Sequence, residues 1–187
     1  MNLPNILTLI RLVLVPTLAI VWFSSLPERG LICALVFSLA ALTDWLDGFV
    51  ARYLAQQTEF GAFLDPVADK LLVSTSLILL AAFFDSVLFT LSSIVIIGRE
   101  ILVSSIRQWM SMGRDSKLIP VSFLGKIKTF IQMVAIIICF AVPHPDLMNH
   151  PGIWLLVVAT IFTVISLIDY VRKFLSVFLV QLNSKNN

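Results

Sequence analysis

Apolar residues fill six long segments of the chain, and short polar turns separate these segments. The apolar segments cover residues 6–25, 31–52, 63–83, 87–109, 122–142 and 151–174. Each is close to the ~20 residues that an α-helix needs to cross the hydrocarbon core of a bilayer. The pattern therefore predicts an all-α integral membrane protein, with residues 1–187 forming one domain built as a bundle of six transmembrane helices. Residues 1–11 are a candidate for a short interfacial helix.

The composition supports a membrane protein over a soluble one. Hydrophobic residues make up 59% of the chain and charged residues 13%, whereas soluble domains carry roughly 25% charged residues. The mean hydropathy is +0.99. The formal net charge of +2 is too small to indicate a nucleic-acid partner. Cys33 and Cys139 both fall in apolar runs, so they are interpreted as packing residues.

Three of the predicted spans need charged residues to complete their length. Their uncharged runs cover only residues 30–43, 71–84 and 86–98, and each run is too short to cross a bilayer alone. The charged residues that extend these runs are Asp44, Asp47 and Arg52, then Asp65, Asp69 and Lys70, and finally Arg99, Glu100 and Arg107. Because charged groups inside a membrane usually line a cavity or pair with one another, these residues mark a candidate functional site.

The distribution of basic residues predicts the orientation. With six spans, both termini and the even-numbered turns share one side. The basic residues on that side are Arg52, Arg107, Arg114, Lys117, Arg172, Lys173 and Lys185. The turns on the other side contain Arg29 alone, so both termini and a polar cavity are expected to face the cytosol. Trp22 and Trp154 are expected to anchor the outer interface, and Trp109 the inner one.

Four carboxylates form two pairs at helical spacing. Asp44 and Asp47 are three residues apart, and Asp65 and Asp69 are four apart, so each pair shares one helix face. A tight turn near residue 56 would place the two pairs level across a helical hairpin. Because carboxylates at one level repel unless cations neutralise them, we expect a site for divalent cations. Oxygen-only ligands suit Mg²⁺, Mn²⁺ or Ca²⁺, and two such ions could form a clamp for phosphoryl displacement.

Other interpretations of the carboxylates stay open from spacing alone. They could form structural ion pairs with Arg52 and Lys70, or relay cations in a transporter. A transporter should have polar residues continuing toward the outer face, and the second and third spans lack them. Gly48 and Ala51 share the face of the first acidic pair. Such small residues leave room for a neighbouring helix or for a flat nucleotide.

The spacing of the acidic and small residues resembles the signature of the CDP-alcohol phosphotransferase family. The matched positions are Asp44-x2-Asp47-Gly48-x2-Ala51-Arg52-x8-Gly61-x3-Asp65-x3-Asp69. Three further runs are similar to the bacterial branch of the family that makes phosphatidylglycerol phosphate: NLPNILTLIRLVLVP, GREILVSSIRQWM and GKIKTFIQM. The resemblance covers nearly the full chain, up to about residue 174.

The resemblance implies a six-helix enzyme of the bacterial cytoplasmic membrane, usually a homodimer, with its site open to the cytosol. The reaction it implies belongs to phospholipid biosynthesis: transfer of the phosphatidyl group from CDP-diacylglycerol to glycerol 3-phosphate, giving phosphatidylglycerol phosphate and CMP. The nearest alternative within the family is a cardiolipin synthase. The alternative from another class is a cation transporter with a carboxylate relay.

The resemblance also assigns roles to individual residues. One or two Mg²⁺ or Mn²⁺ ions would be surrounded by Asp44, Asp47, Asp65 and Asp69. Asp69 would be the general base. The cytidine nucleotide would be flanked by Asp44, Gly48, Ala51, Arg52 and Gly61. Apart from the resemblance, Asn5 and Thr8 are three residues apart on the first span and could reach the nucleotide; helix capping or hydrogen bonding between helices is the alternative for both.

The phosphate of the acceptor needs basic groups, and the fourth and fifth spans supply them. Arg99 and Arg107 lie on roughly one face of the fourth span, and arginine suits bidentate phosphate binding. Lys126 and Lys128 open the fifth span, but two residues so spaced cannot both face inward from a regular helix. Lys126, which directly follows Gly125, is the favoured one. Anchoring to anionic lipids of the inner leaflet is the alternative for these four residues.

Overall fold

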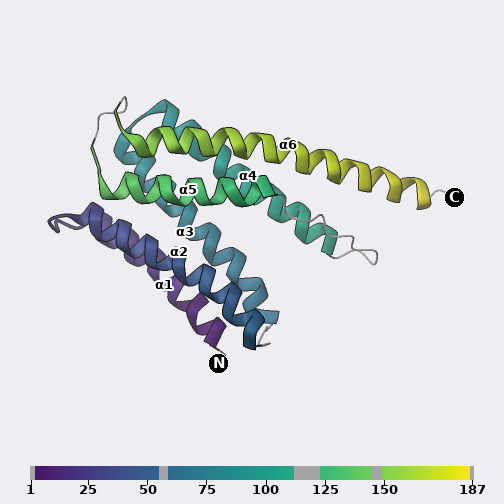
Figure 1. Ribbon diagram of the computed structural model, residues 1–187, viewed down its shortest axis with the longest axis horizontal. Coiled ribbons are helices and arrows are strands. Elements are labelled where there is room, and N and C mark those ends of the chain that lie inside the picture. Colours follow the sequence, from purple (N-terminus) through teal and green to yellow (C-terminus); the bar gives the residue numbers. More distant parts are fainter. Residues whose placement is uncertain (1–2, 55–58, 112–122, 145–148, 186–187) are drawn as a thin grey trace.

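The computed structural model describes residues 3–54, 59–111, 123–144 and 149–185. These residues form six α-helices and no strand (Figure 1). The helices are α1 (Leu3–Phe23), α2 (Arg29–Leu54), α3 (Glu59–Phe84), α4 (Val87–Ser111), α5 (Phe123–Ala141) and α6 (Pro151–Lys185). Each predicted apolar segment is therefore a helix, and α6 continues well past the predicted end at residue 174. The turn predicted near residue 56 falls between the end of α2 and the start of α3, outside the described residues.

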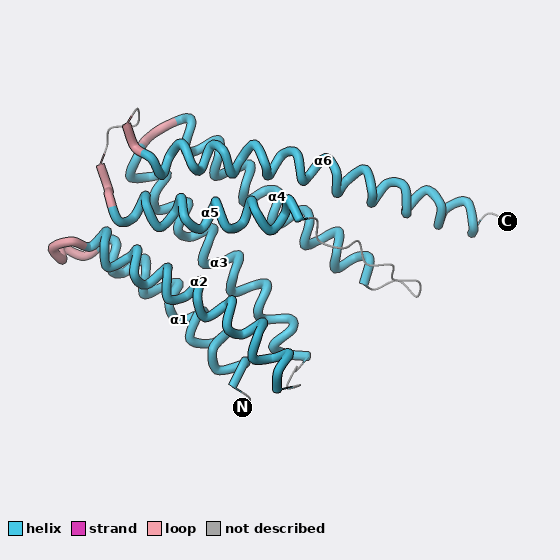
Figure 2. Tube along the Cα trace, viewed as in Figure 1, coloured by secondary structure: helices cyan, strands magenta, loops and turns pink. Residues whose placement is uncertain are grey.

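The helices pack as two groups, α1 to α3 and α4 to α6, which contact each other. Helix α1 contacts both α2 and α3, whereas α6 contacts α4 and runs alongside α5 (Figure 1). Contacts of α2 with α5 and of α3 with α4 connect the two groups. The loops that join α1 to α2, α3 to α4 and α5 to α6 lie at one end of the molecule (Figure 2). This up-and-down arrangement agrees with the topology that the apolar segments predict.

The connection from α3 to α4 is the shortest that the structure describes. It consists of Asp85, whose φ of 45° lies in the left-handed region, and Ser86. The hydroxyl oxygen of Ser86 accepts a hydrogen bond of 3.5 Å from the amide of Phe89, which is the role of an N-cap residue. So tight a connection makes α3 and α4 antiparallel neighbours.

Apolar side chains fill the interior and also cover much of the outside. Leu18, Phe37 and Leu77 have no exposed surface, whereas Phe23 is 76% exposed and Phe130 is 72% exposed. The other large apolar side chains that are more than 55% exposed include Val13, Ile20, Leu35, Leu39, Leu42, Phe63, Ile78, Val87, Leu91, Ile94 and Ile101. Soluble monomers rarely expose extensive apolar surface of this kind.

Three helices are long and apolar enough to cross a membrane, judged by length and composition over the described residues. The segments are Phe63–Phe84 in α3, Val87–Met110 in α4 and Pro151–Ser176 in α6. Shorter apolar segments lie at Thr8–Phe23, Arg29–Thr43 and Ile127–Ala141. The predicted all-α architecture is confirmed for the described residues. The assignment of all six helices as membrane spans stays a prediction.

The end of the bundle that carries the three loops is closely packed around Trp22. This side chain is 5% exposed, and its ring meets Phe83 and Phe140 edge to face, with centroids 5.4 and 5.3 Å away. The expectation that Trp22 anchors an interface is therefore wrong, because the ring fills the core between α1, α3 and α5. Trp109 and Trp154 are 53% and 51% exposed, as an interfacial role requires.

Two glycines let the starts of α2 and α6 approach α5 at this end. A Cβ atom on Gly30 would collide with the carbonyl oxygen of Phe140, and one on Gly152 would lie 2.6 Å from Sγ of Cys139. Real Cβ atoms do not tolerate such distances, so any larger residue would push these helices apart. The close approach fixes α5, which carries part of the candidate site toward its other end.

Candidate active site

The α3 carboxylates lie beside the first helix. Asp65 and Asp69 are one turn apart on α3 and both are partly exposed. Thr8 of α1, which is completely buried, donates its hydroxyl hydrogen to Oδ1 of Asp65. Thr8 therefore makes a hydrogen bond between helices to one of the four acids, and its contact with the nucleotide stays a prediction. Gly61, one turn before Asp65, is buried.

A cavity of about 240 Å³ opens between α3, α4 and α5. Its wall includes Asp69 from α3, and Arg99 and Arg107 from α4. Its other charged wall residues are Lys70 and Glu100. One cavity thus brings together Asp69, predicted as the base, and Arg99 and Arg107, predicted to bind phosphate. These residues lie far apart in the sequence. A carboxylate and two guanidinium groups in one cavity suit a small molecule that carries both a hydroxyl and a phosphate.

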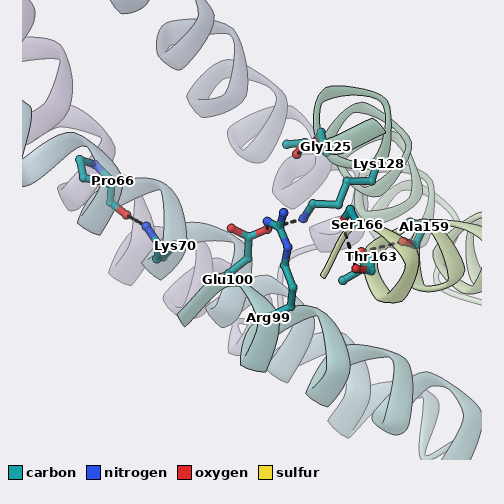
Figure 3. Close-up of polar contacts among 10 residues, drawn as sticks. Pro66, Lys70, Arg99, Glu100, Gly125, Lys128, Ala159, Thr163 and Ser166 are labelled. Atoms are coloured by element: carbon teal, nitrogen blue, oxygen red, sulfur yellow. Dashed lines mark hydrogen bonds and ion pairs between the residues drawn. The ribbon is translucent and has the colours of Figure 1, made fainter. Parts of the chain in front are cut away.

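In this wall, one carboxylate oxygen pairs with two cations. Oε1 of Glu100 accepts a hydrogen bond of 3.0 Å from Nη1 of Arg99, and it also accepts one from Nζ of Lys128 on α5. Figure 3 shows the three side chains converging. Lys128 is 1% exposed, and an enclosed ammonium group requires such a counter-charge.

The predicted phosphate-binding residues do not all line the cavity. Arg99 and Arg107 belong to the cavity wall, but Lys128 is not among the cavity-lining residues and points to Glu100 instead. Lys70 also lines the cavity, and its Nζ donates a hydrogen bond of 2.9 Å to the carbonyl oxygen of Pro66 (Figure 3). Among the predicted phosphate-binding residues whose side chains are described, Arg99 and Arg107 line the cavity, and their role in acceptor binding stays a prediction.

Several predicted site residues stand on described helices, but their side chains lie outside the described part of the structure. These positions are Asn5 on α1, Asp44, Asp47, Gly48, Ala51 and Arg52 on α2, and Lys126 on α5. Among the described side chains, no three His, Cys, Asp or Glu residues gather as a metal site would require. Because Asp44 and Asp47 fall outside that search, the four-carboxylate metal site stays a prediction.

Sequence reasoning missed two polar residues that the structure encloses. Arg11, one turn after Thr8 on α1, is completely buried. Its position as a lone arginine within an apolar span could have indicated a buried polar role. Gln132 on α5 is 2% exposed and lines the cavity. Gly125, Thr129 and Gln132 recur at spacings of four and three, which puts all three on one helix face.

Comparison with known proteins identifies the family to which this arrangement belongs. Residues 1–167 match the model of the CDP-alcohol phosphatidyltransferase family. The chain belongs to this family. The predicted family and the predicted class of enzyme are thereby confirmed.

Bacterial relatives within this family are similar over most of the chain. A protein of Sodalis glossinidius (strain morsitans) is 42% identical over 170 residues, which cover 91% of this chain and 93% of the relative. One from Wigglesworthia glossinidia brevipalpis is 49% identical over 136 residues, or 73% and 75% of the two chains. One from Escherichia coli (strain K12) is 41% identical over 171 residues, or 90% and 92%. All three are named CDP-diacylglycerol–glycerol-3-phosphate 3-phosphatidyltransferase.

Proposed function

We propose that the protein transfers the phosphatidyl group of CDP-diacylglycerol to glycerol 3-phosphate, producing phosphatidylglycerol phosphate and CMP. The relatives' shared name motivates the choice of substrates. In this chain, the main support for the proposal is the cavity that Asp69 lines together with Arg99 and Arg107. A cation transporter is set aside because the chain belongs to a transferase family.

In this proposal the two arginines hold the acceptor and Asp69 activates it. Arg99 and Arg107 bind the phosphate of glycerol 3-phosphate through charge-assisted hydrogen bonds. Asp69 takes the proton of the primary hydroxyl group as general base. The hydroxyl oxygen attacks the phosphorus that carries diacylglycerol, the bond from that phosphorus to the bridging oxygen breaks, and CMP leaves with the bridging oxygen.

We further propose that Asp44, Asp47, Asp65 and Asp69 hold one or two Mg²⁺ or Mn²⁺ ions. The α3 residues fit this role, because Asp65 and Asp69 present partly exposed oxygen donors from one helix face. Bound ions would offset the charge of the pyrophosphate and of the departing CMP. Thr8 would then fix the orientation of Asp65.

The cytidine nucleotide is expected beside the same carboxylates, where α1 lies against both α2 and α3. Two buried residues support this position. Thr8 contacts Asp65, and Gly61 lies one turn before Asp65 on α3. The full predicted nucleotide-binding set is Asn5, Thr8, Asp44, Gly48, Ala51, Arg52 and Gly61.

The enzyme is proposed to span the bacterial cytoplasmic membrane with six helices, its termini and site facing the cytosol. The exposed apolar side chains and the three long apolar helices support a membrane location. Such a location keeps the acyl chains of both lipids in the bilayer while the head group enters the polar cavity. A homodimer stays an expectation of the family resemblance.

The function is tested with the full-length protein purified in detergent. It is supplied with CDP-diacylglycerol, Mg²⁺ or Mn²⁺, and one acceptor at a time: glycerol 3-phosphate, phosphatidylglycerol or serine. We expect CMP release with glycerol 3-phosphate. Release only with phosphatidylglycerol would make the protein a cardiolipin synthase, and the absence of CMP with every acceptor would overturn the enzyme assignment.

A further inference from the structure

Two polar side chains of α5 line the cavity, and they differ in whether their hydrogen bonds are satisfied. Thr129 donates its hydroxyl hydrogen to the carbonyl oxygen of Gly125 at 2.9 Å, so the helix itself satisfies this donor. Gln132, one turn further on, is 2% exposed, and its Oε1 has no hydrogen-bond partner within the described part of the chain. The cavity is thus lined by a residue whose buried amide oxygen has no hydrogen-bond partner among the described residues.

Three buried hydroxyl groups, by contrast, are satisfied by their own helices. Ser76, Ser93 and Thr163 each donate to the carbonyl oxygen four residues earlier, at 2.8, 2.9 and 2.7 Å. An enclosed polar atom without a partner costs about 1–3 kcal/mol. An apolar residue at position 132 would avoid that cost, so the amide is best explained by a ligand that completes its hydrogen bonds.

We propose that Gln132 recognises the secondary hydroxyl group of the acceptor, an inference that rests on the proposed function. Glycerol 3-phosphate has three polar groups: a phosphate for Arg99 and Arg107, a primary hydroxyl for Asp69, and a secondary hydroxyl between them. Arginine side chains only donate hydrogen bonds, so they leave the hydrogen of the secondary hydroxyl without an acceptor. The amide oxygen of Gln132 supplies that acceptor from the same cavity wall.

This role makes Gln132 a residue that determines specificity. A site that hydrogen-bonds a substrate hydroxyl rejects the analogue without it, because the buried partner is then left unpaired. The matching analogue is 3-hydroxypropyl phosphate, which keeps the phosphate and the primary hydroxyl and lacks the secondary one. Wild-type enzyme should prefer glycerol 3-phosphate over this analogue by about tenfold or more in kcat/KM.

The test compares both acceptors on wild-type enzyme and on Gln132→Met, which keeps the side-chain length and removes the amide. We expect the variant to lose about tenfold in kcat/KM for glycerol 3-phosphate and to change little for 3-hydroxypropyl phosphate, which abolishes the preference. Gln108→Met makes the same chemical change at an exposed position of α4 outside the cavity lining, and it should keep the wild-type preference.

Three results would overturn the role of Gln132. The first is an unchanged preference in Gln132→Met, and the second is an equal loss for both acceptors, which would indicate a phosphate contact or a packing role. The third is a wild-type enzyme that uses both acceptors equally. This result would exclude recognition of the secondary hydroxyl even if Gln132→Met cannot be purified. If wild-type enzyme releases CMP only with another acceptor, the proposed function fails as well, so the two failures are distinct.

Discussion

Glu100 of α4 is the counter-charge of Lys128 of α5, whose side chain is 1% exposed. The same carboxylate oxygen also accepts a hydrogen bond from Arg99, which stands at the cavity wall. The ion pairs therefore connect two helices of the cavity and hold one of the proposed phosphate-binding groups. Removing the carboxylate should affect both the stability of the bundle and the binding of the acceptor.

Glu100→Gln is expected to lower the free energy of unfolding by about 2 kcal/mol, less than for a fully buried pair because Glu100 is 28% exposed. The cost arises because the ammonium of Lys128 stays enclosed without a counter-charge. Adding Lys128→Met should recover part of the loss, since it removes the unpaired charge. Unfolding temperatures in detergent measure both effects, and a double variant no more stable than Glu100→Gln would contradict the pairing.

Asp69→Asn should abolish turnover while leaving the binding of CDP-diacylglycerol in place. An amide cannot take a proton from the acceptor hydroxyl, and losing a general base costs about 10²–10⁴-fold in kcat. CMP release measures turnover, and a titration with labelled CDP-diacylglycerol measures binding. Asp169→Asn is the matched control, because Asp169 is exposed on α6 and pairs with Lys173 at 2.7 Å. Retained turnover in Asp69→Asn would remove Asp69 as the base.

Arg99→Ala should raise the KM for glycerol 3-phosphate by about tenfold or more, the scale of a hydrogen bond to a charged group. The KM for CDP-diacylglycerol should change far less, because the guanidinium contacts the acceptor in this proposal. Initial rates over a matrix of both substrate concentrations separate the two constants. Arg172→Ala, on the exposed surface of α6, is the control. An unchanged acceptor KM would return Arg99 to a structural role beside Glu100.

Thr8→Val should weaken the binding of Mn²⁺ by about tenfold, because it removes the hydroxyl that orients Asp65. The substitution keeps the shape of a completely buried side chain. Free Mn²⁺ measured by electron paramagnetic resonance reports binding without substrate or turnover. Thr163→Val is the control, since Thr163 is also buried and donates its hydroxyl hydrogen within α6, to the carbonyl oxygen of Ala159. Equal Mn²⁺ affinity in Thr8→Val and wild type would separate Thr8 from the metal site.

The helices could be predicted from the sequence because each apolar run is long and ends at charged or turn-forming residues. The partners of charged residues on different helices could not be predicted to the same detail. Lys126 and Lys128 were both candidates for phosphate binding, and the contact of Lys128 with Glu100 depends on how α4 and α5 pack. Trp22 was assigned to an interface from its position near the end of a run, but aromatic rings from α3 and α5 enclose it. Gln132 was missed because one amide scarcely changes the hydropathy of its apolar run.

The loop end of the bundle offers a prediction that concerns stability alone. His150 is 2% exposed. Its Nδ1 accepts a hydrogen bond of 3.2 Å from the amide of Gly152, and its Nε2 lies 2.6 Å from the carbonyl oxygen of Val142. The backbone amide of Gly152 can only donate, so Nδ1 is the acceptor of that bond and Nε2 faces the carbonyl oxygen of Val142. The ring therefore ties the end of α5 to the start of α6.

His150→Phe keeps a ring against Phe84 but leaves the carbonyl of Val142 and the amide of Gly152 without these partners. We expect it to lower the free energy of unfolding by about 1–3 kcal/mol, seen as a lower unfolding temperature in detergent. His144→Phe, at an exposed position in the same loop, should have a smaller effect. The KM for glycerol 3-phosphate should stay at its wild-type value, because the cavity involves the opposite half of α5. An unfolding temperature equal to that of wild type would show that the ring does not hold α5 and α6 together.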